Sequence, residues 1–137
     1  MKIYIGHDSR FPQATRVCRK SIEDHSEKGE HEIKYLDKKS LTRVGAYGRK
    51  DVEGESTEFS FTRFYVPMLS HYQGKSLFVD NDFVFKCNPT ELVQYLRDKP
   101  VACVKHKLDN IHNNKMDGVK NKSYPRKCWS SLMLFDN

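Results

Sequence analysis

The stretch KSLFVDNDFVF, residues 75–85, places two carboxylates one residue apart in an otherwise apolar run. Residues 76–79 are aromatic, aliphatic or small and follow Gly74, a pattern that predicts a buried strand. A carboxylate buried without a partner destabilises a fold by several kcal/mol. The sequence therefore raises the question of what Asp80 and Asp82 hold, and a bound cation is the first candidate.

The spacing of the two aspartates supports this interpretation. In an extended segment, side chains at i and i+2 point to the same side, so Asp80 and Asp82 would converge while Asn81 faces away. Mg²⁺ or Mn²⁺ commonly takes one or two carboxylates and leaves the other positions to water and substrate phosphates. We therefore expect a phosphorylated substrate at the end of this strand. The alternative is that Asp-Asn-Asp makes only a polar turn, which these residue types favour.

Further strands and helices alternate on both sides of this stretch. We expect strands at 2–5, 31–36, 76–79, 100–104 and 128–135, and helices of about four turns from Phe11, then at 61–72 and 88–96. Such alternation predicts a three-layer α/β fold with a mainly parallel sheet, in one domain of residues 1–137. Between these elements, 37–58 is expected to be a functional loop, a lid or a missed short helix, and 106–127 a mobile loop.

Two features of the predicted helices are specific enough to test. Apolar side chains recur through 61–72 at helical spacing and are expected to face the core, with Pro67 producing a kink. They are Phe61, Phe64, Tyr65, Met68, Leu69 and Tyr72. In the helix at 88–96, Asn88 is the expected N-cap, and Glu91 is placed to reach back to it.

Composition restricts the function classes. The four cysteines form no CxxC pair, which argues against a structural zinc site and predicts reduced thiols. Apart from the segment between Lys105 and Lys127, the basic residues behind the formal charge of +6 alternate with acids, so nucleic-acid binding is not expected. The apolar run at the N-terminus is too short for a secretory signal or a membrane span. We therefore expect a soluble, cytoplasmic protein without a membrane span.

Three segments in order carry a resemblance to a known family: IYIGHDSR, then FSFTRFYVPMLSHYQGKSLFVDNDFVF, then NPTELV. The sequence resembles the nucleotide-sugar glycosyltransferases of the GT-A fold, particularly family 8, which includes the glycogenin and lipopolysaccharide galactosyltransferase types. That family has an Asp after its first strand, an Arg on a helix and a strand ending in Asp-x-Asp. Here these positions hold Asp8, Arg63 and the triplet at 80–82. The resemblance implies a Rossmann-like GT-A fold and metal-dependent transfer of a sugar, with retention of configuration favoured.

The resemblance also implies roles for individual residues. The donor would be a nucleoside diphosphate-sugar, with a UDP-sugar as first choice, and the acceptor is unknown. Asp80 and Asp82 would hold Mn²⁺ or Mg²⁺ against the diphosphate, and Arg63 would approach the donor sugar or phosphates. The implied donor-binding residues are Gly6, His7, Asp8, Arg63, Asn81, Ser130 and Ser131. Trp129 stands where the family often has Asn, and its ring could stack on a sugar.

Each implied role has an alternative. Asp8 could cap the helix that begins near Phe11, and His7 could be an exposed loop residue. Arg63 could be a surface residue or could offset the charge of the two aspartates. Related enzymes take a third metal ligand, usually His, from a segment well downstream that has no counterpart here, and neither His106 nor His112 is selected by spacing. A minimal enzyme, a truncated donor-binding half and a chain completed by another subunit, a second copy included, all stay open.

Two other function classes compete with the glycosyltransferase. In a phosphohydrolase of the haloacid dehalogenase type, the first Asp would attack phosphorus and the second would act as acid and base, but there the pair lies on the first strand. The other class is a non-catalytic basic module that binds nucleic acid or an acidic glycan. Its binding residues would be Lys105, Lys107, Lys115, Lys120, Lys122, Arg126 and Lys127.

Overall fold

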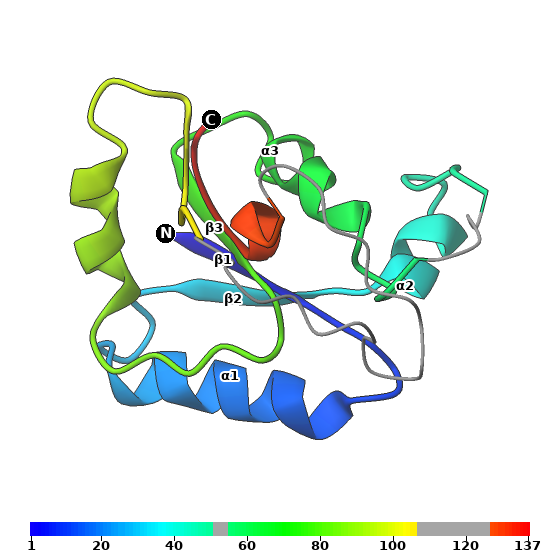
Figure 1. Cartoon of the computed structure of the whole chain (residues 1–137), viewed down its shortest axis with the longest axis horizontal. Helices are drawn as coiled ribbons and strands as arrows, with labels where there is room; N and C mark the ends of the chain where they lie inside the picture. Colours follow the sequence, from blue (N-terminus) through cyan, green and yellow to red (C-terminus); the bar gives the residue numbers. More distant parts are fainter. Residues whose placement is uncertain (51–54, 107–126) are drawn as a thin grey trace.

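The computed structural model describes residues 1–50, 55–106 and 127–137 (Figure 1). Its elements, with η for a 3₁₀ helix, are β1 (Lys2–Gly6), α1 (Pro12–Asp24), β2 (Glu32–Leu36), α2 (Lys38–Arg43), η1 (Thr62–Tyr65), α3 (Val66–Leu69), β3 (Lys75–Val79), η2 (Pro89–Tyr95), β4 (Val101–Cys103), η4 (Trp129–Ser131) and β5 (Leu132–Asp136). In the described part of the chain, no helix combines the length and apolar character needed to cross a bilayer.

The strands form a five-stranded sheet in the order β2-β1-β3-β5-β4. β1 pairs in parallel with β2 and β3, whereas β5 lies antiparallel between β3 and β4. Four strands therefore point the same way and β5 is reversed, so the sheet is mixed, with two parallel and two antiparallel pairings. Because β5 runs against β3, the residues just before β5 lie beside those just after β3. The amide of Asp80 accordingly donates a hydrogen bond to the carbonyl of Ser131 at 2.9 Å.

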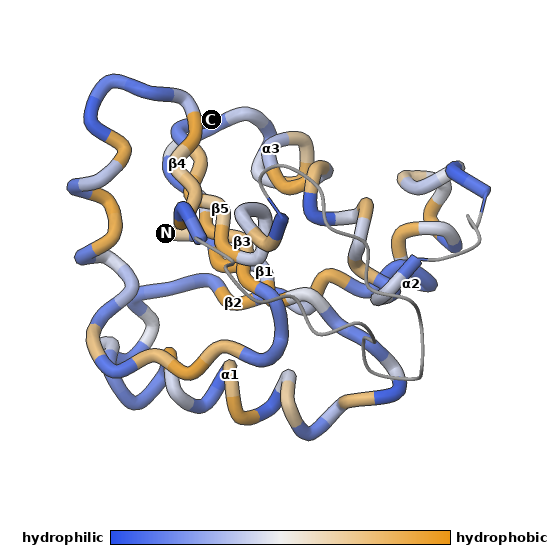
Figure 2. Tube along the Cα trace, viewed as in Figure 1, coloured by the Kyte–Doolittle hydropathy of each residue, from blue (hydrophilic) through white to orange (hydrophobic). Residues whose placement is uncertain are grey.

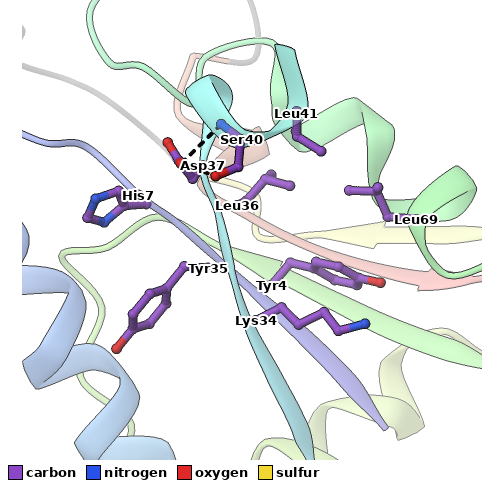
Figure 3. A pocket seen from close by; sticks show the side chains of 9 residues that line it. All are labelled: Tyr4, His7, Lys34, Tyr35, Leu36, Asp37, Ser40, Leu41 and Leu69. Atoms are coloured by element: carbon purple, nitrogen blue, oxygen red, sulfur yellow. Dashed lines mark hydrogen bonds between the residues drawn. The ribbon is translucent and has the colours of Figure 1, made fainter. Parts of the chain in front are cut away.

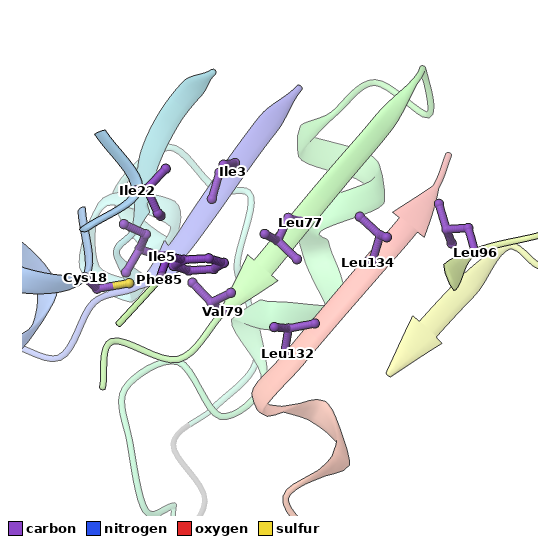
Figure 4. Close-up of a cluster of buried hydrophobic side chains, with 10 residues drawn as sticks. All are labelled: Ile3, Ile5, Cys18, Ile22, Leu77, Val79, Phe85, Leu96, Leu132 and Leu134. Carbon is purple, nitrogen blue, oxygen red and sulfur yellow. The ribbon is translucent and has the colours of Figure 1, made fainter. Parts of the chain in front are cut away.

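Alternation along the strands creates a core on each face of the sheet. On one face, Ile3, Leu77 and their neighbours pack against Cys18 and Ile22 of α1 (Figure 4). The members of this cluster are Ile3, Ile5, Cys18, Ile22, Leu77, Val79, Phe85, Leu96, Leu132 and Leu134. The opposite face buries Tyr4, Leu36, Phe59, Val66, Phe78, Met133 and Phe135. Figure 2 shows the resulting apolar centre between more polar outer segments, the three-layer arrangement that the sequence predicts.

The stripe expected to face the core at 61–72 does so only in part: Leu69 packs against the core cluster that contains Tyr4 and Phe78, but three of the six stripe residues are exposed. Phe64 is 56% exposed, Met68 37% and Tyr72 66%, whereas Thr62, Arg63 and Val66 are buried. The segment begins as the 3₁₀ helix η1 and continues as the single turn α3, with Pro67 at the start of α3 rather than at a kink. A 3₁₀ turn has three residues instead of 3.6, so the face predicted from an unbroken α-helix is only partly correct.

Three other segments differ in detail from the expected elements. The 37–58 segment contains a short helix, α2, capped by Asp37, whose carboxylate accepts the amides of Lys39 and Ser40. The helix at 88–96 forms as the 3₁₀ helix η2. Asn88 is its cap as expected, but the acid that contacts the Asn88 side chain is Glu30 rather than Glu91. β5 begins only at Leu132, after η4.

Candidate functional site

Arg63 joins three segments at the carboxyl end of β3. Its Nη1 donates to the carbonyl of Ser130 at 2.6 Å and to the Ser130 hydroxyl at 3.1 Å. The same nitrogen lies 3.1 Å from Asp80 Oδ1 in an ion pair, while Nε donates to the carbonyl of Phe59 at 3.3 Å. Three of the residues implicated by the sequence, Arg63, Asp80 and Ser130, therefore meet although they come from η1, the end of β3 and η4.

The surroundings of Arg63 explain why it pairs with an acid. The residue is 7% exposed, and its guanidinium carbon lies 4.9 Å from the ring centre of Phe78 and 5.5 Å from that of Phe59. A buried guanidinium needs a nearby anion to offset its lost hydration. The interpretation of Arg63 as a surface residue is therefore wrong, and its expected role in offsetting charge is confirmed for Asp80.

Asp80 is held in a desolvated position, where its Oδ1 is ion-paired with Arg63 but accepts no hydrogen bond from the described residues. Burial raises the pKa of the Asp80 carboxyl to about 7, opposed by the positive charge of Arg63 and reinforced by the negative charge of Asp82. A buried acceptor without a donor fits a cation ligand.

Asn81 and Asp82 do not continue the strand. β3 ends at Val79, and residues 81–82 form a turn, so the extended conformation expected for 80–82 is wrong. Asn81 is 8% exposed instead of facing outward, and its Nδ2 has no hydrogen-bond partner in the described part of the chain. Asp82 is exposed, and its charge contributes to raising the pKa of Asp80 and, after burial, that of Cys18. That both carboxylates bind one ion stays a prediction.

The available ligands constrain such an ion. Among residues 1–50, 55–106 and 127–137, no group of three or more His, Cys, Asp or Glu side chains is arranged to hold a metal. A cation at Asp80 and Asp82 would therefore complete its shell with water or phosphate oxygens, as Mg²⁺ commonly does. His112, one candidate third ligand, lies outside the described residues. The other, His106, has a buried Nε2 without a hydrogen-bond partner in the described part of the structure, and its carbonyl accepts from Trp129.

Asp8 is buried, but neither as a cap nor as a free carboxylate. Its oxygens accept Arg10 Nε at 2.9 Å and Arg10 Nη2 at 2.8 Å, together with the backbone amides of Arg10 and Glu58. The N-cap of α1 is Phe11, with no side-chain cap, so the capping interpretation of Asp8 is wrong. The hydrogen bond from the Arg10 side chain is the largest cause of the lowered pKa of Asp8. Asp8 thus fastens the turn after β1 to the segment before η1.

A cavity of about 410 Å³ lies at the carboxyl ends of β1 and β2 (Figure 3). Its lining residues are Tyr4, His7, Lys34, Tyr35, Leu36, Asp37, Ser40, Leu41 and Leu69. The ring of His7 stacks on Tyr35, with ring centres 5.9 Å apart. Small-molecule sites typically occupy about 300–1,000 Å³, so this cavity has sufficient volume. Tyr35 and Asp37 were not singled out from the sequence, although both sit where β2 ends.

Packing against Phe59 explains why position 6 is a glycine. A Cβ atom at position 6 would lie 2.6 Å from Cγ of the Phe59 ring, closer than any ordinary contact. The glycine therefore lets Phe59 lie against β1, and Phe59 in turn contacts Arg63. Of the three residues expected to border the nucleotide, only His7 lines the cavity at the ends of β1 and β2.

The segment around η4 supplies one contact to Arg63 and several local ones. Ser130 is bound by Arg63, whereas the Ser131 hydroxyl donates to the carbonyl of Cys128 at 2.7 Å and closes the turn. Trp129 is half-buried and donates through Nε1 to the carbonyl of His106 at 3.3 Å. The predicted basic module falls mostly on Lys107, Lys115, Lys120, Lys122 and Arg126, which lie outside the described residues. Of its other members, Lys127 is buried and Lys105 lies over the Trp129 ring.

Comparison with known proteins gives one relative and one solved structure. The chain is 40% identical over 136 residues to Protein CDI of Arabidopsis thaliana, which covers 98% of this chain and 52% of that protein. The chain thus spans about half the length of this curated relative. No protein-family model matches.

The solved structure is the apo form of WbbM, a bifunctional glycosyltransferase. It superposes with a TM-score of 0.64 at 18% identity, over 99% of this chain and 31% of WbbM. At this identity the likeness concerns the fold. The chain has an α/β fold with a mixed five-stranded sheet that matches part of a GT-A glycosyltransferase.

Proposed function

We propose that the chain is the donor-binding part of a metal-dependent glycosyltransferase that moves a sugar from a nucleoside diphosphate carrier to an acceptor. The observation that carries the proposal is the convergence of Arg63, Asp80 and Ser130 at the carboxyl end of β3, where Asp80 Oδ1 accepts no hydrogen bond from the described residues. Ligands of open α/β sheets bind at this edge. The likeness of the fold to part of a GT-A glycosyltransferase supports the same assignment.

Asp80 and Asp82 would hold the cation, Mn²⁺ or Mg²⁺. When bound, such an ion neutralises the oxygens of a departing diphosphate as a Lewis acid. A cation beside Asp80 would also favour the ionised carboxylate, against the burial that raises the Asp80 pKa to about 7. Arg63 alone offsets this burial only in part. The site is therefore more complementary to a cation than to a second anion.

Arg63 serves as a positioning residue in this proposal. Its guanidinium is enclosed by Phe59 and Phe78 and bonded to Ser130, so its effect on the donor passes through the fixed carboxylate of Asp80. Asn81 is a second polar group next to Asp80, and its buried Nδ2 has no acceptor among the residues described. In this proposal, Nδ2 of Asn81 donates a hydrogen bond to an oxygen of the nucleoside diphosphate-sugar.

The cavity at the ends of β1 and β2 is the proposed place for the base and ribose of a UDP-sugar. Two stacked rings, His7 and Tyr35, line it beside polar groups of Asp37 and Ser40. A planar base adds a further ring to such a stack, and offset aromatic pairs contribute about 0.5–1.5 kcal/mol beyond area burial. The acceptor stays unassigned.

Calorimetric titration of UDP in the presence and absence of Mn²⁺ tests the proposal. We expect metal-dependent binding by the wild type, and its loss in Asp80→Asn and in Asp82→Asn with the folding transition retained. Asp98→Asn is the matched control, because it removes the same charge from a side chain 79% exposed on the surface. Equal UDP affinity of the wild type and all three variants would contradict the proposed function. A phosphoryl group trapped on Asp80 would instead favour the phosphohydrolase alternative.

A further inference from the structure

A second cavity, on α2 and the chain just after it, has a strongly basic lining. From residue 38 to residue 50 the sequence contains five basic residues and no acid. These residues and Thr42 line a cavity of about 550 Å³; they are Lys38, Lys39, Arg43, Arg49 and Lys50. Figure 2 shows hydrophilic and hydrophobic stretches alternating along this part of the chain.

The turn after α2 is what gathers these charges. The amides of Ala46 and Tyr47 both donate to the carbonyl of Leu41, at 2.9 and 3.1 Å, so the chain folds back along the helix. Gly45, with φ of +72°, adopts the left-handed conformation that this reversal uses. Arg49 and Lys50 thereby line the same cavity as Lys39 and Arg43.

Two of the cations are held in place by aromatic rings. The guanidinium carbon of Arg49 lies 3.9 Å from the ring centre of Phe61, and Lys38 Nζ lies 5.5 Å from that of Tyr47. Side chains that are already ordered lose less entropy when they bind a ligand. The cavity is therefore partly preorganised.

Acidic side chains balance only part of this charge. Lys38 pairs with Glu55 at 2.9 Å and Lys39 lies 3.6 Å from Glu58. For the other three cations, Arg43, Arg49 and Lys50, the described part of the chain supplies no carboxylate within ion-pair distance. Three like charges around one cavity repel one another, and a compact anion with several charges relieves that repulsion.

We propose that this basic cavity binds a soluble small molecule that carries three or more adjacent phosphate groups. The basic cavity shares no lining residue with the proposed base and ribose cavity, although both border α2. None of its lining residues contacts Arg63, Asp80 or Ser130 in the hydrogen bonds and ion pairs of the described residues. Phosphate oxygens match both the fork of arginine and the point charge of lysine. Binding here needs no divalent cation.

The test uses inorganic triphosphate, titrated calorimetrically into the whole chain in the presence of EDTA. We expect saturable binding at one site, and the double variant Arg43→Gln/Lys50→Gln to weaken it about tenfold. Arg16→Gln/Lys86→Gln is the matched control: it removes one exposed Arg and one exposed Lys elsewhere, and should leave the affinity within about twofold. Equal weakening by both double variants, or no saturable binding, overturns the proposal.

Two further experiments distinguish a soluble phosphate ligand from a lipid headgroup, and the basic cavity from the proposed donor site. Co-sedimentation with vesicles of phosphatidylcholine and phosphatidylserine, without binding of triphosphate, would overturn the claim of a soluble ligand. Triphosphate affinity should be retained in Asp80→Asn/Asp82→Asn, because those residues are not part of the basic cavity. Absence of triphosphate binding would therefore not contradict the donor-site proposal, and absence of metal-dependent UDP binding would not contradict the basic-cavity proposal.

Discussion

At the scale of single residues, Arg63 and Asp8 show how charge connects distant parts of the chain. Arg63 contacts both Asp80, at the end of β3, and Ser130, which lies 67 residues after Arg63 in the chain. Asp8, after the end of β1, contacts Glu58, which lies 50 residues after Asp8. In both cases a buried ion offsets its lost hydration with a specific partner. The sequence motif identified both residues, but it did not identify these partners, which depend on tertiary structure.

Asp8→Asn should destabilise the fold at neutral pH by about 1–3 kcal/mol, because a buried, charged acceptor loses strength in its bonds to Arg10 and Glu58. The folded-state pKa of Asp8 lies below its ordinary value of 3.8. Its stabilisation is therefore fully present above pH 3.8 and is lost as the pH falls through the folded-state pKa. Urea unfolding of the wild type and the variant should show a gap at neutral pH that narrows in acid. A gap that is constant with pH would contradict this account.

Gly6→Ala should destabilise the protein by about 1–3 kcal/mol, because the new methyl group meets the Phe59 ring and the core must shift. Gly48→Ala is the control: nothing lies within 4 Å of its Cβ position, so the free energy of unfolding should change little or rise slightly. Both values come from chemical denaturation. Identical effects of the two substitutions would show that Phe59 does not pack against β1 as described.

At the scale of elements, η1 and α3 show what a periodic pattern leaves undecided. An apolar residue every three or four positions predicts a helix but does not fix which face is buried when the helix changes type. Here the change from η1 to α3 at Val66 rotates the face, and Arg63 is turned inward toward Asp80. Strands were more predictable: β3 begins directly after Gly74 and β4 directly after Pro100, although the last strand begins four residues later than predicted.

The burial at η1 and α3 can be tested with a pair of truncations. Val66→Ala should cost about 2 kcal/mol, because it removes two buried methyl groups from a side chain with no exposed surface. Phe64→Ala removes far more atoms, yet it should cost less than about 1 kcal/mol, because Phe64 is 56% exposed. Urea denaturation of both variants measures the difference. A larger loss of stability in Phe64→Ala than in Val66→Ala would show that Phe64 faces the core, against the burial described here.

At the scale of the whole molecule, the sequence predicted the layers better than the site. Alternating elements were sufficient for an α/β sheet with helices on both faces. The reversed direction of β5 was not predictable, because it depends on how the chain returns after residue 126, and no local pattern reports that path. The same reversal places Ser131 against Asp80, so the part of the site built on η4 depends on topology rather than on motif.

The positions of the candidate site residues were predictable in part, whereas their roles stay a prediction. His7, Asp80, Arg63 and Ser130 lie at the carboxyl ends of the strands, and Asn81 is buried beside them. Tyr35 was missed because an aromatic residue in a strand is usually explained by packing in the core or by surface exposure, and the sequence does not show that it lines a cavity. The turn at 81–82 was missed because the apolar residues that follow resemble a continued strand.

The central claim is that the end of β3 binds a nucleoside diphosphate-sugar through a divalent cation. Thermal denaturation with a panel of nucleoside diphosphate-sugars, each with and without Mn²⁺, tests it most directly, because a ligand that binds only the folded state raises the melting temperature. We predict a rise of about 5–10 °C for one donor at roughly a hundredfold excess over its Kd, and only with the metal. No shift for any donor, or an equal shift without Mn²⁺ and in Asp80→Asn, would contradict the account.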